Sequence, residues 1–407
     1  MKCRFDSSEL SEEFVDLGHC PPSNAYLRPE ELSEAEVHYP LKLYVNERNF
    51  LVQVDECKRA NEIFGDDYAY FSSFSVSWLR HAEKYVNMMI KRFDLRSDNR
   101  VVELASNDGY LLQYFQQQGI PVLGVEPSSS VAKAAIAKGI DTIVKFFGVK
   151  LARRMRANGM AADVIVGNNV LAHVPDLNDF VGGMKILLKT NGVLTMEFPH
   201  LMKLVDHVEF DTIYHEHYSY YSFYTVLKIF EAHGLELFDV EEISTHGGSL
   251  RIYGQHTGGC QPTSPNVSAL LEEERAKGMQ TLEYYHGFQQ KVDQVKIALL
   301  RFLIEQKIEG RSVVGYGAAA KGNTLLNFCG VRADLVRYVV DACDHKQGRY
   351  MPGSHIPIVD ESHIRRTQPD YVIILPWNLK DEIVEQLEYI REWGGRFVTA
   401  IPELQIF

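Results

Sequence analysis

Short apolar runs that suit β-strands alternate with helical segments in two separate stretches of this 407-residue chain. The first stretch predicts, in order, a helix at Ser72–Phe93, a strand at Val101–Leu104, and then alternating helices and strands at Tyr110–Gln118, Val122–Val125, Ser129–Lys138, Val164–Val166, Leu177–Leu188 and Val193–Glu197. The second predicts a strand at Ser312–Tyr316, a helix at Lys321–Cys329 and strands at Val336–Val340 and Tyr371–Leu375. Because strands joined by helical crossovers pair in parallel, each stretch predicts a doubly wound, Rossmann-like α/β domain.

The chain is too long for one hydrophobic core, and three parts are expected. Residues 1–70 look like a small irregular lobe with a poor core and one hairpin, from Tyr39 to Val54. Residues 71–245 hold the first α/β domain, and residues 246–407 hold the second. A long helix is expected over about 268–307, where apolar residues recur at spacings of four, three, four and three.

Composition disfavours several classes of protein. No apolar run approaches the roughly 18 residues needed to span a bilayer, and the first ten residues lack the apolar core of a signal peptide, so we expect a cytoplasmic protein. The six cysteines are widely spaced, which favours thiols over disulfides. A net charge of −12 disfavours nucleic acid as a partner. The oligomeric state is not indicated.

Acidic and amide side chains stand where the first three strands of the first domain end. Glu103 is followed by a turn of small residues, Glu126 closes the second strand 23 residues later, and Asn168 and Asn169 follow the third. A carboxylate at the end of the second strand can accept both ribose hydroxyls of a cofactor, although it can also simply cap the strand. The turn lacks GxGxxG, which disfavours NAD, and it is typical of turns that wrap the methionine part of S-adenosylmethionine.

The nine residues from Tyr214 to Ser222, YHEHYSYYS, combine two histidines, a glutamate and four tyrosines. Histidine and glutamate are easily tuned for proton transfer near neutral pH, and a tyrosine hydroxyl can donate to an oxyanion. The block therefore predicts an active site, with a polar surface loop or a hydrogen-bonded core cluster as the alternative. A metal site at His215, Glu216 and His217 is disfavoured, because adjacent residues rarely present three donors to one ion.

A glycine-rich turn from Gly315 to Asn323 follows the first strand of the second domain and opens a helix. Its backbone amides and the positive helix end suit a diphosphate, although a tight packing turn without a ligand has the same composition. It also permits an NAD(P)-dependent sugar-nucleotide oxidoreductase or epimerase, in which Asp341 would hold the ribose.

Taken together, these segments resemble the family of sugar C-methyltransferases that act on nucleotide-linked deoxysugars, over nearly the whole chain. The matching motifs are Glu103 with Asn107-Asp108-Gly109, Glu126-Pro127-Ser128, Phe146-Phe147, Asn169 to Pro175, Tyr214-His215-Glu216-His217, Gly315 to Lys321, Asn327 to Gly330 and Pro352 to Pro357. The resemblance implies a class I S-adenosylmethionine-dependent methyltransferase domain followed by a Rossmann-like domain that binds the sugar nucleotide. Cofactor contacts are expected from Glu103, Ala105, Asn107, Asp108, Gly109, Glu126, Pro127, Phe146, Phe147, Asn168 and Asn169.

The family's substrate, a 4-keto-6-deoxyhexose on a nucleoside diphosphate, implies methylation of C3 through an enolate. We expect His217 to be the general base, although the sequence leaves Tyr70 and His173 open for that role. Glu216 and Tyr214 are expected to orient the base or the sugar, or to stabilise the enolate. Substrate contacts are expected from Tyr68, Ser72, His246, Arg251, Tyr316, Lys321, Asn323, Trp377 and Asn378, with Arg251 offsetting the diphosphate's charge.

One departure from the family concerns its amino-terminal zinc lobe, which carries two CxxC pairs. Here the first pair retains only Cys3, with Asp6 opposite, and the second pair appears as Asn46 and Asn49. Asparagine is a poor zinc ligand, so we expect no zinc, and the substitution of Cys20 or Cys57 is disfavoured by their unpaired spacing. The lost ligands also leave open a non-catalytic descendant of the enzyme, against which Tyr214, Glu216 and His217 speak.

Overall fold

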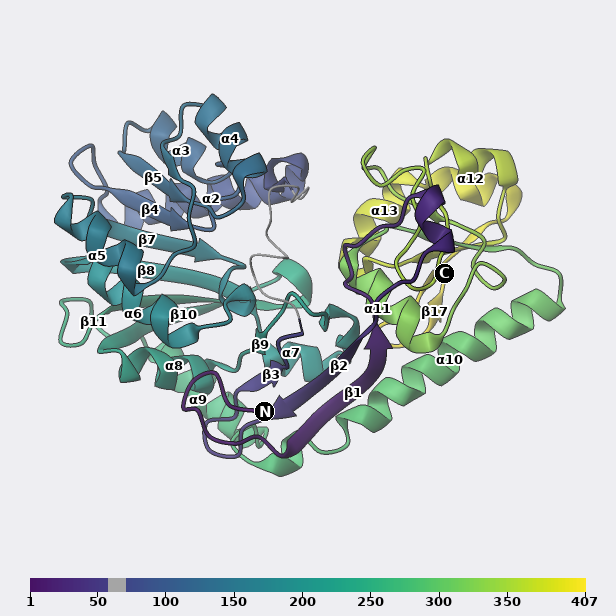
Figure 1. Ribbon diagram of the computed structural model, residues 1–407, viewed down its shortest axis with the longest axis horizontal. Helices are drawn as coiled ribbons and strands as arrows, with labels where there is room; N and C mark the ends of the chain where they lie inside the picture. Colours follow the sequence, from purple (N-terminus) through teal and green to yellow (C-terminus); the bar gives the residue numbers. More distant parts are fainter. Residues whose placement is uncertain (58–70) are drawn as a thin grey trace.

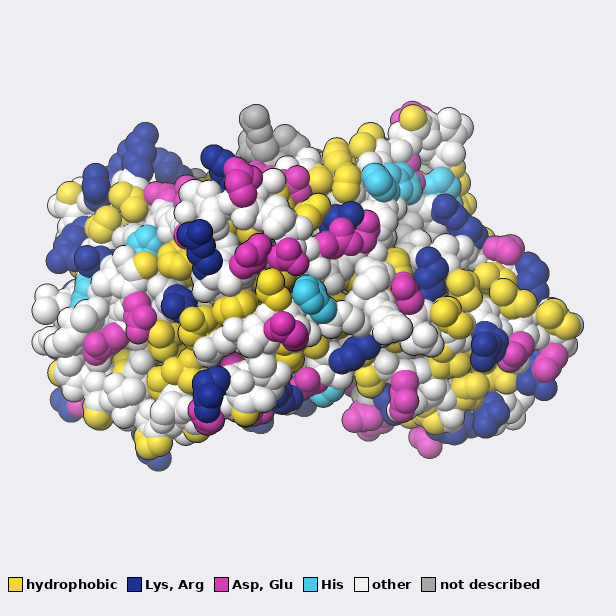
Figure 2. Space-filling view, turned by 90° about the horizontal axis from the view of Figure 1, so that it is seen from below, with side chains coloured by type: hydrophobic (Ala, Val, Ile, Leu, Met, Phe, Trp, Pro, Cys, Tyr) yellow, Lys and Arg dark blue, Asp and Glu magenta, His cyan; other side chains and the backbone are white. Residues whose placement is uncertain are grey.

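The computed structural model describes residues 1–57 and 71–407, and Figure 1 shows two α/β bodies with an amino-terminal sheet between them. Tyr68 and Tyr70, predicted to bind substrate and to act in catalysis, lie outside the described residues. Sheets of four, seven and six strands organise the chain. In the described part, every helix is too short or too polar to traverse a lipid bilayer. On the face shown in Figure 2, basic side chains are scattered among acidic ones.

The first α/β stretch forms a seven-stranded sheet of order β10-β11-β8-β7-β4-β5-β6. Its strands are β4 (Val101–Leu104), β5 (Val122–Val125), β6 (Thr142–Ile143), β7 (Ala162–Asn168), β8 (Leu188–Pro199), β10 (Leu235–Ile243) and β11 (Ser249–His256). The strands from β8 to β6 are parallel, and β11 runs antiparallel between β8 and β10. This is the predicted class I methyltransferase fold.

Helices cover both faces of this sheet, as the two-residue period of a strand requires. They are α2 (Val76–Phe93), α3 (Leu112–Gln117), α4 (Ser129–Ala137), α5 (Val149–Ala157), α6 (Leu177–Leu187) and α8 (Phe223–Ala232). On β7, Val164 and Val166 pack with residues of α2 and α3, whereas Ile165 packs with residues of α5, α6 and α8. Strand β11 lies beyond the predicted domain boundary at residue 245 but pairs in this sheet, which therefore extends to His256.

The amino-terminal lobe is more regular than the sequence predicted. The expected hairpin forms β2 (Tyr39–Val45) and β3 (Val52–Val54), but β1 (Glu12–Cys20) was missed, and β9 (Ser219–Tyr220) of the YHEHYSYYS block completes the sheet in the order β1-β2-β3-β9. Nor is its core poor. Leu17, Leu41 and Leu43 are buried in one cluster with residues of the long helix α10 (Phe288–Ile308) and of the carboxyl-terminal domain.

The four positions of the family's zinc site do come together, but hydrogen bonds join them. The Asn49 amide nitrogen donates to Asp6 Oδ2 at 3.1 Å and lies 3.6 Å from Cys3 Sγ, and the Asn46 amide nitrogen lies 3.4 Å from Asp6 Oδ1. Burial raises the pKa of the Cys3 thiol, which keeps it protonated. Structural zinc sites almost always use four ligands drawn from cysteine thiolates and neutral histidine imidazoles. One thiol, one carboxylate and two donating amides do not fit it.

The second α/β stretch forms a six-stranded sheet of order β14-β13-β12-β15-β16-β17. Its strands are β12 (Val313–Tyr316), β13 (Val339–Val340), β14 (Ile358–Val359), β15 (Tyr371–Ile374), β16 (Arg396–Thr399) and β17 (Gln405–Ile406), of which only β17 is antiparallel to its neighbour. The helices are α11 (Ala320–Cys329), α12 (Ser362–Thr367) and α13 (Lys380–Gln386). The predicted alternation is confirmed, with the strand expected at Val336–Val340 shortened to its last two residues.

The predicted long helix over 268–307 is wrong as one element. It consists of α9 (Pro265–Ala276), which packs on the seven-stranded sheet, and α10, which runs on to the carboxyl-terminal domain (Figure 1). Gly278 and Gly287 have φ of +85° and +86°, a left-handed conformation that ends a helix. The apolar spacing that suggested the helix lies within α10.

We predict that Asn49→Ala lowers the free energy of unfolding by about 1–3 kcal/mol, because Asp6 and the Leu51 amide, which donates to Asn49 Oδ1 at 3.0 Å, lose a partner. Chemical denaturation measures this, with the exposed Asn158→Ala as control. A metal chelator should leave the midpoint of the wild-type transition unchanged. A large drop with chelator, together with stoichiometric zinc in the purified protein, would contradict the hydrogen-bonded cluster.

Candidate active site

The turn after β4 has a backbone conformation that ordinary residues rarely adopt. Ala105, Asn107 and Gly109 have φ of 56°, 49° and 76°. Such conformations cost on the order of 1–3 kcal/mol each for residues with a Cβ and concentrate at ligand sites. The turn is held by the Asn107 amide, which donates to Glu126 Oε2 at 2.9 Å, and by the Ser72 amide, which donates to Asn107 Oδ1 at 3.0 Å. Ser72, predicted to contact substrate, therefore lies against the cofactor turn.

Two buried carboxylates flank this turn. Glu126 at the end of β5 also accepts from the Ser128 amide at 2.8 Å, and burial raises its pKa. Burial raises the pKa of Glu103 well above its ordinary value, and the charges of Glu126 and Asp108 add to this effect. Asp108 accepts from Ser73 Oγ and forms an ion pair with Lys138 at 3.1 Å. Glu126 is thus pinned by main-chain donors at the strand end, where a ribose would lie.

Polar atoms without a protein partner lie at the end of β7. Both side-chain polar atoms of Asn168 and the oxygen of Asn169 are buried without a hydrogen bond to any described residue. Asn169 has φ of 54°, and its amide nitrogen lies 2.9 Å from His246 Nε2. Unsatisfied buried polar groups are costly, and they suit a site that a polar ligand completes. These residues fit S-adenosylmethionine.

The Phe146-Phe147 pair does not act as a unit. Phe147 packs edge-on against Phe180, with ring centroids 5.5 Å apart, and so belongs to the interior beside α6. Phe146 is 48% exposed. Pro127, between Glu126 and Ser128, follows β5. Of the predicted cofactor residues, those at the ends of β4, β5 and β7 are brought to one edge of the sheet, because parallel strands share their carboxyl edge.

His217 of the YHEHYSYYS block and His173, which lies outside it, are fixed by oriented contacts. His217 Nδ1 lies 3.1 Å from the Thr212 carbonyl, and its Nε2 lies 2.8 Å from the Tyr214 hydroxyl. His173 Nδ1 lies 2.8 Å from the Glu216 carbonyl, and its ring meets that of His217 edge-on, with centroids 4.6 Å apart. Both Nδ1 atoms face carbonyl oxygens, so both carry the proton and leave Nε2 as the basic nitrogen.

Electrostatics keeps these histidines neutral. Burial, reinforced by His173, lowers the pKa of His217 well below its ordinary value of 6.5. Burial lowers the pKa of His173 to about 4, and burial reinforced by the charge of Lys321 lowers the pKa of His246 to about 4. A neutral imidazole at pH 7 is able to accept a proton, which is the state a general base needs.

Glu216 and His215 of the same block contact residues of the amino-terminal lobe. Glu216 Oε1 accepts from the Asn24 amide at 2.7 Å. His215 Nε2 lies 3.1 Å from the Pro40 carbonyl, and its ring packs edge-on against Tyr39. In the described residues no group of three or more histidine, cysteine, aspartate or glutamate side chains is arranged to hold a metal ion.

Three of the substrate contacts predicted in the carboxyl-terminal domain lie together, namely Lys321, Trp377 and Asn378. Lys321 Nζ lies 2.7 Å from Asn378 Oδ1 and 4.5 Å from the centre of the Trp377 ring. Asn323 is fully buried, and its amide nitrogen lacks a hydrogen-bond partner among the described residues. The Tyr316 hydroxyl instead accepts from Gln386 at 2.8 Å, in the separate core between β12 and α13.

Asp341 also has a structural role in this domain. It accepts from the Ala318 amide of the glycine-rich turn at 2.8 Å, from the Cys343 amide at 2.9 Å and from Lys346 at 3.2 Å. A carboxylate that holds its own turn in this way has little capacity left for a ribose.

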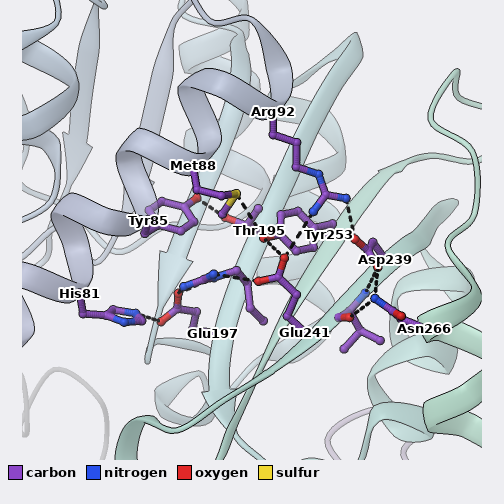
Figure 3. Close-up of polar contacts among 12 residues, drawn as sticks. His81, Tyr85, Met88, Arg92, Thr195, Glu197, Asp239, Glu241, Tyr253 and Asn266 are labelled. Carbon is purple, nitrogen blue, oxygen red and sulfur yellow. Dashed lines mark hydrogen bonds and ion pairs between the residues drawn. The ribbon is translucent and has the colours of Figure 1, made fainter.

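Arg251 is placed differently from the prediction. Its guanidinium, 7% exposed, forms ion pairs with Glu197 at 2.6 Å and Glu241 at 3.0 Å, two carboxylates that are labelled in Figure 3. His81 of α2 lies 2.8 Å from the other oxygen of Glu197. Two carboxylates already balance the charge of Arg251, so it is not positioned to offset a diphosphate.

The sequence did not predict three side chains that lie near Lys321 or His246. Asp211 and Glu209 are buried beside Lys321, and burial raises their pKa to about 6 and about 8. Trp78 of α2 stacks between His81 and His246, with ring centroids 4.8 and 5.3 Å away. The only sequence signal for the two acids was their place just before the YHEHYSYYS block. For Trp78 no signal existed, since it reads as one apolar residue of an amphipathic helix.

Comparisons with known proteins agree with the fold. The family models "Putative zinc binding domain", "Methyltransferase domain" and "C-methyltransferase C-terminal domain" match residues 3–64, 78–240 and 244–402. Among solved structures, magnesium protoporphyrin IX methyltransferase (ChlM) of Synechocystis PCC 6803 with bound SAM is 16% identical, covering 48% of this chain and 89% of that one, with a TM-score of 0.35. The PH0226 protein of Pyrococcus horikoshii OT3 is 15% identical, covering 49% and 99%, with a TM-score of 0.37.

A relative of known class matches the chain from end to end. The C-methyltransferase NovU of Streptomyces niveus is 32% identical over 405 residues, which cover 100% of this chain and 96% of NovU. Because the TM-scores above are below 0.5, the assignment rests on this relative, the family models and the observed strand order. The chain belongs to the C-methyltransferase family that its motifs indicated, and it is an S-adenosylmethionine-dependent C-methyltransferase.

Proposed function

We propose that this enzyme methylates C3 of a 4-keto-6-deoxyhexose linked to a nucleoside diphosphate. The observation that carries the proposal is the neutral His217 imidazole, with Nδ1 directed at the Thr212 carbonyl and Nε2 beside the Tyr214 hydroxyl. Methylation of oxygen needs little more than a positioned hydroxyl. Methylation of carbon first requires that this carbon lose a proton, and a neutral imidazole paired with a phenol hydroxyl suits that step.

In the proposed mechanism His217 Nε2 takes the C3 proton, which the neighbouring ketone makes acidic. The Tyr214 hydroxyl, 2.8 Å from Nε2, would turn its proton toward the developing enolate oxygen. His173 packs against His217 and excludes water from one side of it. S-adenosylmethionine supplies the electrophilic methyl group, and the new C–C bond forms as the C–S bond breaks.

The sugar nucleotide would enter between the two α/β domains. Lys321 and Asn378, with the unsatisfied amide of Asn323, are the proposed contacts to its diphosphate or sugar, and Lys321 replaces Arg251 as the cation. The pKa of Lys321 is lowered by burial, which the nearby carboxylates Asp211 and Glu209 oppose. At the other edge, Glu126 would accept the ribose hydroxyls of the cofactor, and Asn168 and Asn169 would bind its polar groups.

For the base, we predict that His217→Gln lowers the rate of methylation of a nucleoside-diphosphate 4-keto-6-deoxyhexose about 10²- to 10⁴-fold, because the C3 proton loses its acceptor. Binding of S-adenosylhomocysteine, measured by calorimetry, should be unchanged. His215→Gln is the matched control, because His215 lies in the same block and contacts Pro40 and Tyr39 of the amino-terminal lobe. A His217 variant within about threefold of wild type, or a control that loses as much, would refute the assignment.

For the cofactor, Glu126→Ala should weaken the affinity for S-adenosylhomocysteine about 10- to 100-fold, because a doubly hydrogen-bonded acceptor at the turn is lost. The exposed Asp141→Asn changes the charge by the same amount just before the neighbouring strand β6, outside the turn. Calorimetric titration distinguishes the two. Equal affinity in both variants would place the ribose elsewhere, and tight binding of NAD in place of S-adenosylhomocysteine would favour the oxidoreductase alternative.

The pH dependence follows from the lowered pKa of His217. Because the folded-state pKa lies below 6.5, the imidazole stays neutral as the pH falls through 6.5, and protonation removes the base only at lower pH. We therefore predict that kcat/KM is flat across pH 6.5–8 and declines only below that range. A steady-state pH profile measures this. An acidic limb centred at 6.5 or above would mean that a group other than His217 controls the rate, such as Glu209, whose pKa burial raises to about 8.

A further inference from the structure

The indole of Trp377 contacts three groups, which belong to Asp211, Lys321 and Gly247. Trp377 begins the 3₁₀ turn η7 (Trp377–Leu379), just after β15, and its indole Nε1 donates to Asp211 Oδ2 at 2.9 Å. Lys321 Nζ lies over the ring. A methyl group built on Gly247 would come within 2.5 Å of Cη2, so the Gly247 backbone packs directly on the indole edge. The sequence predicted that Trp377 contacts substrate, but its indole nitrogen already donates to Asp211 and the edge of its ring packs on Gly247.

The first of these contacts leads to the base. Asp211 lies in the turn η4 (Phe210–Thr212), whose next carbonyl, that of Thr212, faces His217 Nδ1. The same turn is tied to the carboxyl-terminal domain a second time, because Thr324 Oγ1 of α11 donates to the Ile213 carbonyl at 2.8 Å. The carbonyl that orients His217 is therefore held from both sides by the other domain.

The contact with Gly247 leads to the cofactor edge. Gly247 follows His246, whose Nε2 pairs with Asn169 at the end of β7. His246 and Gly247 have φ of 56° and +96°, so this turn keeps an unfavourable conformation that packing must enforce. The indole edge of Trp377 and the carboxylate of Glu209 are the groups nearest to Gly247.

We propose that Trp377 is a positioning residue that transmits the placement of the carboxyl-terminal domain to the general base, with Asp211 as its hydrogen-bond acceptor. The inference rests on the proposed function of His217. Asp211 is fully buried, and its Oδ1 lacks a partner among the residues described, so the indole N–H is a main constraint on the carboxylate. Without that donor the carboxylate shifts toward Lys321, and the adjacent Thr212 carbonyl turns away from His217 Nδ1.

The arrangement has a functional consequence. Lys321 and Asn378, the proposed nucleotide contacts, lie in the same domain as Trp377. Lys321 Nζ lies over the Trp377 ring and donates to Asn378, which follows Trp377 in the chain. Binding of the sugar nucleotide to these residues would fix the position of the carboxyl-terminal domain. Through Trp377 and Asp211, that position would keep the proton of His217 on Nδ1, so that Nε2 can accept the C3 proton when substrate is present.

The test uses full-length Trp377→Phe and Asp211→Ala, with Asp211→Asn as the conservative variant that retains an acceptor for the indole. Trp393→Phe is the matched control, because it removes an indole donor of the same domain whose partner, the Pro369 carbonyl, is remote from the base. Two readouts are taken: ring ¹⁵N shifts of His217, assigned with His217→Gln, and steady-state kinetics with a thymidine-diphosphate 4-keto-6-deoxyhexose, including exchange of its C3 hydrogen with deuterated solvent.

We expect Trp377→Phe and Asp211→Ala to lower kcat and C3 exchange about tenfold or more through misplacement of the base, with KM for the sugar nucleotide within about twofold. The ¹⁵N shifts should move from the Nδ1-protonated tautomer toward a mixture, and Asp211→Asn should recover most of the loss. If Trp377→Phe fails to fold, the two Asp211 variants decide.

A raised KM with kcat preserved would make Trp377 a substrate contact and overturn the proposal, as would unchanged ¹⁵N shifts. If His217→Gln itself stays active, the proposed function fails, whereas a shifted tautomer in Trp377→Phe would still support the positioning contact. The two failures are therefore distinguishable.

Discussion

The segment from Phe210 to Tyr221 is hydrogen-bonded to all three parts of the chain, and the placement of the histidines depends on it. Its Ser219 pairs with Gln53 of the amino-terminal sheet, its Tyr218 amide donates to the Ala172 carbonyl beside β7, and its Ile213 carbonyl accepts from Thr324 of the carboxyl-terminal domain. Buried main-chain groups must find partners, and here each domain supplies some of them. No single domain therefore builds the site, which explains why its residues are spread over most of the sequence.

The chain's own pattern predicted the two Rossmann-like sheets and the edge at which their polar groups meet, because alternation and strand ends are local features. The predicted cofactor contacts Glu126 and Asn168 came from these strand ends, whereas His217 was predicted from the composition of the YHEHYSYYS block and from the family resemblance. Features that depend on distant partners were not. β1 is recognisable only once α10 packs on it, the helix break at Gly278 and Gly287 depends on where α9 must turn, and Arg251 was assigned to substrate because its two carboxylate partners lie 54 and 10 residues away.

Charge balance decides which cation serves the substrate. Arg251 is surrounded by Glu197 and Glu241, and its removal from water is offset only by those partners, so a diphosphate would have to compete with them. Its role is to fasten β11 to β8, while His81 joins α2 to the same carboxylate (Figure 3). Lys321 instead contacts a neutral amide and an indole face, with the carboxylates of Asp211 and Glu209 further off. An anion arriving at Lys321 displaces weaker contacts, which favours it as the substrate's cation.

The amino-terminal lobe tolerates the replacement of its thiolate ligands for a related reason. A domain of about 60 residues that folds alone usually needs a metal or disulfides, because its own core supplies too little free energy. This lobe does not rely on its own core. Phe14 stacks on Phe288 of α10 at 4.6 Å, and the buried residues of β1 and β2 join one cluster with the carboxyl-terminal domain. The Asn49 hydrogen bonds then need only to close the hairpin between β2 and β3, and β3 in turn pairs with β9 beside His217. The active-site segment thus pairs with a strand of the lobe, and this pairing does not depend on zinc.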